Sequence, residues 1–190
     1  MAATALIRPG VSASGMMEEF IKRQRNPETI RHAHPRMGEI LKDTHGVIVY
    51  QEDVLKVLHE LAGVSLGKAD LLRRMMSGKA LDSRTAREDL ERDFIEKCEQ
   101  RGIDKSARAK IWEQIASFVG YSFCKAHAAQ FAILAWQCAY LKAHHPAEFM
   151  AAVLSNHGGF YATSAYIQEC RRLGLAIHPP CVNRSELDFT

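Results

Sequence analysis

The chain has 190 residues, of which 47% are hydrophobic and 25% are charged, and its formal net charge is +3. This composition is typical of a folded globular protein and excludes a largely disordered chain, which would lack the apolar residues for a core. The best apolar stretch, residues 128–141, is too short to span a membrane, and five cysteines without a CxxC pair favour neither a disulfide framework nor a zinc site. We expect a cytoplasmic protein with no membrane partner.

The first 45 residues contain several prolines and glycines, and they predict only one short helix. This amphipathic helix covers residues 16–23, and Ser14 is its expected N-cap. The next segment, Gly46–Tyr50, reads GVIVY and is rich in β-branched residues. Because such residues favour extended backbone, this segment predicts the one β-strand of the chain.

From Gln51 onward the apolar residues recur at helical spacing. The expected helices cover residues 51–62, 65–78, 83–101, 104–119, 125–143, a segment opened by Pro146, and residues 163–173. Ser65 and Asp104 are expected N-caps. The helix over residues 125–143 is apolar nearly all round, which predicts that it is the central buried helix. The fold class is therefore mainly α, with one small β element and extended termini that include residues 175–190.

A first basic cluster lies near the end of the second of these helices. It contains Lys68, Arg73, Arg74 and Lys79, with Asp70 as the only acidic residue among them. Asp70 precedes the arginines by three and four residues, so it can pair with either, which leaves the other guanidinium for an anion such as phosphate. The alternative is a solvated basic helix end with no ligand.

A second cluster lies where a glycine-containing turn enters the apolar helix, in the sequence GYSFCKAH over residues 120–127. Lys125 and His127 stand in the first helical turn, where unpaired N–H groups already carry partial positive charge. Two basic groups there favour a bound anion, and Tyr121 and Phe123 add flat surface on which a base could stack. The alternative is that both aromatic residues belong to the core and that Lys125 is solvated.

Five blocks of the sequence, in order along the chain, resemble one known family. They are residues 7–16 (IRPGVSASGM), 46–54 (GVIVYQEDV), 61–75 (LAGVSLGKADLLRRM), 120–129 (GYSFCKAHAA) and 140–152 (YLKAHHPAEFMAA). The chain is thereby identified as similar to the C-family of bacterial DNA polymerases, the family of the DNA polymerase III alpha subunit. The resemblance implies that residues 1–45 form the end of the palm and its connection to the fingers. It implies a helical fingers domain over residues 46–174, and an extended segment over 175–190 that leads toward a C-terminal region.

The same resemblance implies roles for the two basic clusters in a DNA-directed DNA polymerase. The phosphates of the incoming deoxynucleoside triphosphate (dNTP) would contact Arg73, Arg74, Lys79, Lys125 and His127, and the base pocket would include Tyr121 and Phe123. The other implied partners are template-primer DNA and the remaining palm, thumb and clamp-binding domains. The Mg²⁺ cofactor of the family is held by palm carboxylates upstream of the first block, so we expect no catalytic or metal-binding residue here, and no activity from the chain alone.

The sequence departs from the family pattern at a few positions. Ala80 replaces a second lysine after Lys79, while Cys124 and Ala126 replace an asparagine and a serine that commonly flank the lysine of the turn. Residues 158–161 resemble the error-prone branch of the family more than the replicative one. Two alternatives from other classes remain: a stand-alone helical module that binds DNA or nucleotides without catalysis, and a helical scaffold without a ligand.

Overall fold

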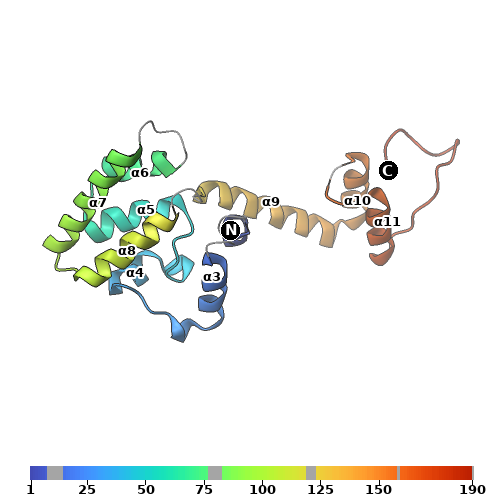
Figure 1. Ribbon diagram of the computed structural model, residues 1–190. Coiled ribbons are helices and arrows are strands. Elements are labelled where there is room, and N and C mark those ends of the chain that lie inside the picture. The colour runs from blue at the N-terminus through green and yellow to red at the C-terminus, as the bar shows by residue number, and fades with distance from the viewer. Residues whose placement is uncertain (8–14, 77–82, 119–122, 158, 190) are drawn as a thin grey trace. The chain divides into compact units, whose positions relative to one another are not determined.

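The computed structural model describes residues 1–7, 15–76, 83–118, 123–157 and 159–189 (Figure 1). These residues form two compact units, Met1–Phe131 and Ala132–Thr190. All regular structure in the described ranges is helical, which confirms the mainly α class. The functional division at residues 45 and 174 stays a prediction.

The first unit contains most of the helices. They are α1 (Ala2–Leu6), α3 (Met16–Arg25), η1 (Pro27–Thr29), α4 (Pro35–Ile40), η2 (Lys42–Thr44), α5 (Gln51–Lys56), η3 (Val57–Ala62), α6 (Leu66–Met76), α7 (Ser83–Gln100), α8 (Lys105–Phe118) and the start of α9 (Lys125–His144). Two predicted N-caps are confirmed: the Lys68 N–H donates to Ser65 Oγ at 3.4 Å, and the Ala107 N–H donates to Asp104 Oδ1 at 2.9 Å. The third is not confirmed: Ser14 lies outside the described residues, and the residue at the N-cap of α3 is Gly15, which offers no capping side chain. The helices α1 and α4 were not expected, so the N-terminal part is less extended than predicted.

The predicted strand over residues 46–50 is wrong, because the described residues contain no strand at all. Residues 47–50 are nevertheless buried, and their side chains are divided between two cores. Val47 and Val49 pack in one cluster with Ala5 and Phe20, whereas Ile48 packs in the main cluster. The β-branched residues therefore suit a single extended segment that is covered on both sides, and no second strand is needed.

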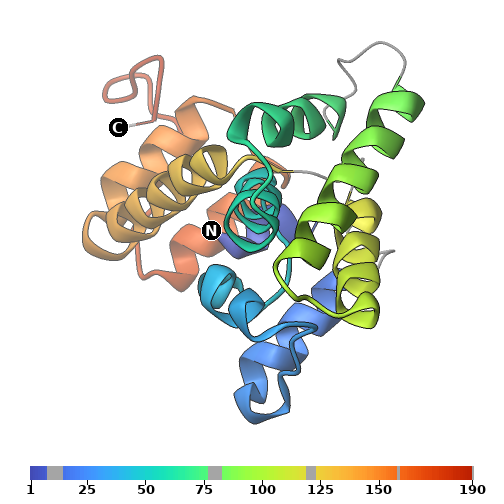
Figure 2. The ribbon, with the colours of Figure 1, turned by 90° about the vertical axis from the view of Figure 1, so that its left-hand side faces the viewer.

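The main core surrounds the continuous helix formed by α5 and η3, where Leu58 and Leu61 are fully buried. This helix contacts α4, α6 and α7, which are grouped around it in Figure 2, and α7 in turn packs on α8. Across that last interface Phe94 lies against Trp112, with ring centroids 5.4 Å apart. This packing fixes the position of Gln51, the first residue of α5.

The C-terminal end of η3 is capped by Arg101, which directly follows α7. Gly63 has φ of 80°, a left-handed conformation that favours glycine. The guanidinium of Arg101 donates hydrogen bonds to the carbonyls of Glu60 and Leu61, at 3.1 and 2.9 Å. Carbonyl groups at a helix end have no partner within the helix, so Arg101 satisfies two of them.

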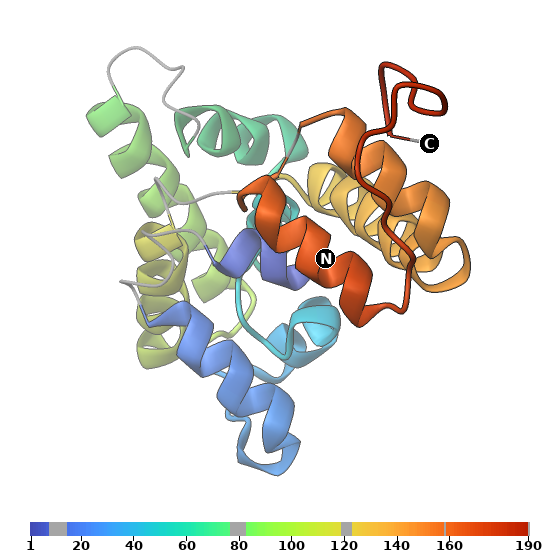
Figure 3. The ribbon, with the colours of Figure 1, turned by 90° about the vertical axis from the view of Figure 1, so that its right-hand side faces the viewer.

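The second unit contains the later part of α9, then α10 (Pro146–Ser155) and α11 (Thr163–Arg172), which pack on each other (Figure 3). Pro146 opens α10 as predicted. Lys142 and Glu169 form an ion pair of 2.6 Å, and hydrogen bonds with Arg172 and Lys142 lower the pKa of Glu169 to about 2. Residues 175–189 contain no helix or strand, as expected for the tail.

The prediction that α9 is the central buried helix is wrong. Ala128 is its one buried residue, while Ile133 and Trp136 are 60% and 65% exposed. The boundary between the two compact units falls within this helix, so most of its length belongs to the core of neither unit. The apolar composition of α9 predicts that the helix is buried against some surface, but it does not specify which surface that is.

Candidate functional site

The first turn of α9 is held by a carboxylate from α5. The Lys125 N–H donates to Glu52 Oε2 at 2.9 Å, and the Cys124 thiol lies 3.5 Å from Glu52 Oε1. An acidic group is favourable at this position, because the first N–H groups of a helix lack partners inside it and carry partial positive charge. The sequence pattern predicts an anion at this helix end, and the Glu52 carboxylate of the same chain provides part of that negative charge.

The Lys125 side chain also has an acidic partner. Its Nζ lies 3.4 Å from Asp43 Oδ2 and 5.7 Å from the centroid of the Tyr50 ring. The Asp43 side chain is 63% exposed and that of Lys125 is 31% exposed, so the pair lies at the surface. An exposed ion pair contributes at most about 1 kcal/mol to stability, which leaves the ammonium available for a stronger anion.

The segment beside Lys125 is fixed by a buried carboxylate. Asp53 Oδ2 accepts hydrogen bonds from the N–H groups of Val49 and Tyr50, at 3.0 and 2.9 Å. Burial raises the pKa of Asp53 above its ordinary value, although these two hydrogen bonds and the nearby charges of Lys125 and Lys56 oppose the shift. Burial also raises the pKa of Tyr50, with Asp53 and Glu52 adding to the effect.

His127 lies on the exposed side of the same turn, within an aromatic row. Its ring centroid is 5.5 Å from that of Phe123 and 4.7 Å from that of Phe131. Phe123 is partly buried and packs against the cluster that contains Tyr50 and Ala128. The core alternative for Phe123 thus has direct support, while the ring still forms part of the surface beside His127. Tyr121 lies outside the described residues.

Two members of the basic cluster near α6, Lys68 and Arg74, have described side chains. Arg74 pairs with Asp70 through a 2.9 Å hydrogen bond between Nε and Oδ2. Lys68 forms a 3.3 Å ion pair with Asp93 of α7. The backbone of Arg73 belongs to α6, but its side chain lies outside the described part of the structure, as does the whole of Lys79.

The structure therefore places Lys125 and His127 in the first turn of α9 and Arg74 on a separate helix, α6. Sequence reasoning gave no role to Glu52 and Asp43, the two carboxylates that hold Lys125. Glu52 had a usable signal, because it lies in one of the blocks that carry the family resemblance. Asp43 had none, since its contact with Lys125 joins positions 82 residues apart.

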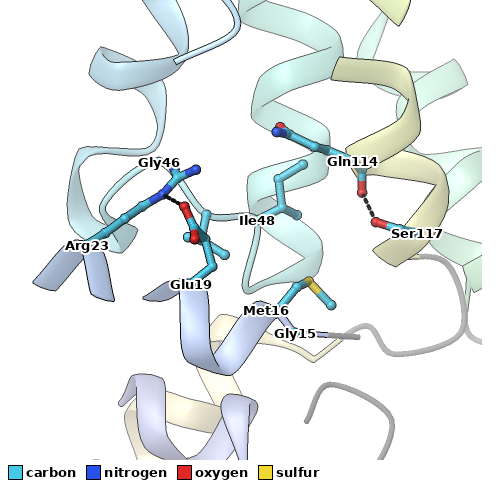
Figure 4. A pocket seen from close by; sticks show the side chains of 9 residues that line it. Gly15, Met16, Glu19, Arg23, Gly46, Ile48, Gln114 and Ser117 are labelled. Atoms are coloured by element: carbon cyan, nitrogen blue, oxygen red, sulfur yellow. Dashed lines mark hydrogen bonds and ion pairs between the residues drawn. The ribbon is translucent and has the colours of Figure 1, made fainter. Parts of the chain in front are cut away.

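A pocket of about 210 Å³ lies in the first unit, beside the segment that leads to Tyr50. Figure 4 shows Glu19 and Arg23 of α3 on one side and Gln114 and Ser117 of α8 on the other. Arg23 is already bound, because it pairs with Glu19 at 2.7 Å and donates to the His45 carbonyl at 3.1 Å. Those predicted site residues whose side chains the structure describes do not line this pocket.

Two other kinds of feature are absent from the described ranges. They contain no group of three or more His, Cys, Asp or Glu side chains that could hold a metal ion. They also contain no helix that is long and apolar enough to cross a membrane.

Comparison with known proteins relates the chain to one group of polymerases. The family model described as bacterial DNA polymerase III alpha subunit finger domain matches residues 1–102. All of the chain is similar to DNA polymerase III subunit alpha of Treponema pallidum, with 41% identity, and to that of Campylobacter jejuni, with 37% identity. It is also 38% identical to an error-prone DNA polymerase of Symbiobacterium thermophilum. The chain spans 16% of the length of the first two relatives and 17% of the third.

The match to both branches leaves the error-prone assignment as a prediction. Of the segment that suggested it, Gly158 lies outside the described residues, and Phe160 and Tyr161 are exposed at 102% and 72%.

Proposed function

The chain belongs to the family of bacterial DNA polymerase III alpha subunit finger domains, and from this premise we propose that it forms the fingers of a DNA-directed DNA polymerase. In that role it binds the incoming dNTP and contacts the template-primer DNA. The similarity continues beyond residue 102 to the end of the chain, with 41% identity to the Treponema pallidum protein, which supports one function for both compact units.

The observation that carries the proposal is the basic first turn of α9. Lys125 is held at its backbone by Glu52, while its ammonium forms an ion pair of 3.4 Å with the exposed carboxylate of Asp43. A triphosphate carries more charge than one carboxylate, so it replaces Asp43 at Lys125. His127, exposed two residues later, then lies within the same turn and contacts the same phosphates.

Arg74 supplies a second phosphate contact in this proposal. Its side chain is 67% exposed, and its ion pair with Asp70 lies at the surface, where such pairs are weak. A guanidinium binds phosphate through two parallel hydrogen bonds, which is stronger than its pairing with an exposed carboxylate. The roles of Arg73, Lys79 and Tyr121 rest on the family resemblance alone, and Phe123 is assigned to the wall of the nucleotide pocket.

Nucleotide transfer itself requires the remaining domains in this proposal. By the family resemblance, the carboxylates that hold Mg²⁺ belong to the palm, and the fingers supply binding and orientation. The chain therefore acts as part of a longer polymerase polypeptide, and its partners are the palm, the thumb and the clamp-binding region.

The test is single-nucleotide incorporation by the longer polymerase that carries this segment. Lys125→Ala removes a charge-assisted phosphate contact, and we expect incorporation efficiency to fall roughly ten- to a hundredfold. Arg74→Ala should act similarly, and Arg74→Lys should restore only part of the loss. Lys110→Ala, at an exposed lysine of α8, is the matched control and should leave the efficiency unchanged. If Lys125→Ala and Arg74→Ala both behave like this control, the nucleotide-binding role is excluded and a stand-alone helical module becomes the better account.

A further inference from the structure

The starts of α5 and α9 are joined by hydrogen bonds in both directions. The Gln51 N–H donates to the Phe123 carbonyl at 2.9 Å, and the Lys125 N–H donates to Glu52 Oε2 at 2.9 Å. The second bond links positions 73 residues apart in the sequence. Because α5 continues into the main core through η3, this junction ties the first turn of α9 to the most buried part of the first unit.

The Glu52 side chain contacts the backbone at the start of α9. Its two oxygens face different groups, the Lys125 N–H and the Cys124 thiol at 3.5 Å, so the carboxylate spans the last residue before the helix and the first residue within it. A carboxylate bound in this way fixes where the helix begins and in which direction the side chains of its first turn project.

Contacts made by the residues next to Glu52 fix the position of its backbone. Asp53, the next residue, is buried and binds the N–H groups of Val49 and Tyr50, which fixes the backbone that leads into Glu52. The Tyr50 ring lies 5.7 Å from Lys125 Nζ. The same short segment therefore controls the backbone of Lys125 through Glu52 and borders its side chain through Tyr50.

We propose that Glu52 is a positioning residue for nucleotide binding, which holds the first turn of α9 so that Lys125 meets the triphosphate. Glu52 itself touches no phosphate. This inference rests on the function proposed above, in which Lys125 contacts the incoming nucleotide.

The test measures KM for the incoming nucleotide and kcat for single-nucleotide incorporation in the longer polymerase. Glu52→Ala removes the acceptor for the Lys125 N–H, and we expect KM to rise roughly three- to tenfold while kcat stays within about twofold. Glu52→Gln keeps an oxygen that can accept this N–H, so its KM should lie nearer the wild-type value. Glu52→Asp keeps the charge but shortens the reach, and its KM should exceed that of Glu52→Gln. Glu113→Gln, at an exposed position of α8, is the control for loss of a surface carboxylate.

A double variant distinguishes positioning from a general loss of stability. If Glu52 acts through Lys125, adding Glu52→Ala to Lys125→Ala should raise KM no further than Lys125→Ala alone. Multiplicative effects on KM would overturn the proposal, as would a lower melting temperature with an unchanged KM. A fall in KM would overturn it too, because it would show that Glu52 repels the nucleotide. Should Glu52→Ala fail to fold, the order of KM for the Gln and Asp variants decides the question.

The two proposals fail in different ways. If Lys125→Ala leaves KM unchanged, the assigned nucleotide contact is wrong, and the positioning role falls with it. If Lys125→Ala raises KM and none of the Glu52 variants does so, only the positioning role is wrong.

Discussion

Two carboxylates hold Lys125 in different ways, and they should respond differently to substitution. Asp43 contacts only the exposed ammonium, at 3.4 Å, whereas Glu52 contacts the backbone. In the proposed function Asp43 competes with the nucleotide for one cation. Glu52 does not compete, because it binds a group that the nucleotide does not use.

Asp43→Asn should therefore improve nucleotide binding. Removing the competing charge should lower KM for the incoming nucleotide about two- to threefold, and the gain should shrink at high salt because exposed charges are screened. The measurement is KM at low and at physiological ionic strength, with Glu113→Gln as the control. An increase in KM would show that Asp43 helps to bind the nucleotide and does not compete with it.

Asp53 gives a pH-dependent prediction for stability. Burial raises its native pKa above the usual value near 4, so the folded state favours the protonated carboxyl more than the unfolded chain does. This contribution to stability is fully present below about pH 4 and is lost as pH rises through the raised native pKa. Asp53→Asn cannot ionise, so its unfolding free energy should increase relative to wild type as pH rises above about 4. Denaturant unfolding at a series of pH values measures this difference, and a constant difference would contradict the burial account.

The matched change Asp53→Ala tests the hydrogen bonds separately from the charge. It leaves the buried N–H groups of Val49 and Tyr50 without their acceptor, which should cost about 1–3 kcal/mol relative to Asp53→Asn at every pH, because neither variant can ionise at this position. Asp53→Asn retains an acceptor oxygen and should avoid most of this loss. Equal destabilisation by both variants would mean that Asn does not preserve these bonds.

The C-terminal end of helix η3 is stabilised by the close approach of the Arg101 guanidinium to Gly63. A side chain at Gly63 would collide with the Arg101 guanidinium, and the φ of 80° is unfavourable for any residue with a Cβ. Gly63→Ala should therefore destabilise the chain by about 1–2 kcal/mol from the backbone alone, and more if Arg101 releases the carbonyls of Glu60 and Leu61.

A double-mutant cycle separates the backbone cost from the lost hydrogen bonds. Arg101→Ala removes the bonds at 3.1 and 2.9 Å without changing Gly63. If Gly63→Ala also displaces the guanidinium, the two losses in unfolding free energy should sum to more than the loss in the double variant. Strict additivity would show that Arg101 keeps its hydrogen bonds when Gly63 is replaced.

The elements also show which features the sequence could predict. Ser65, Asp104 and Pro146 mark helix starts that the structure confirms, because capping depends on residues only a few positions apart. The β-branched residues over positions 46–50 predict a strand wrongly, because they favour extended, buried backbone whether or not a partner strand is present. Asp53 supplies the acceptor for two of its N–H groups instead.

The candidate site was predictable only where it is local in sequence. Lys125 and His127 lie two positions apart on one turn, so the pattern alone placed them together. Glu52 and Asp43 contact Lys125 from positions 73 and 82 residues away in the sequence. Hydrophobic periodicity and capping patterns are local, so they cannot predict contacts over such distances. The apolar composition of α9 led to the wrong expectation of a buried helix, since composition does not specify which surface covers it.

For the whole molecule, the proposed function requires that Lys125 contacts the incoming nucleotide in the assembled polymerase. Reductive methylation of lysines, followed by mass spectrometry of each labelled site, measures this contact without relying on a substitution. The complex contains the longer polymerase, a template-primer whose primer end lacks the 3′-hydroxyl, and either the complementary or a mismatched nucleotide. Under these conditions the nucleotide binds but is not incorporated.

We predict that the complementary nucleotide slows methylation of Lys125 several-fold, whereas the mismatched nucleotide has little effect. Lys110, exposed on α8, should be methylated at the same rate in both complexes. The contrary result is that Lys125 reacts at the same rate with and without a complementary nucleotide that is independently shown to be bound. Lys125 then does not contact the nucleotide, and the proposed nucleotide-binding role of α9 is wrong.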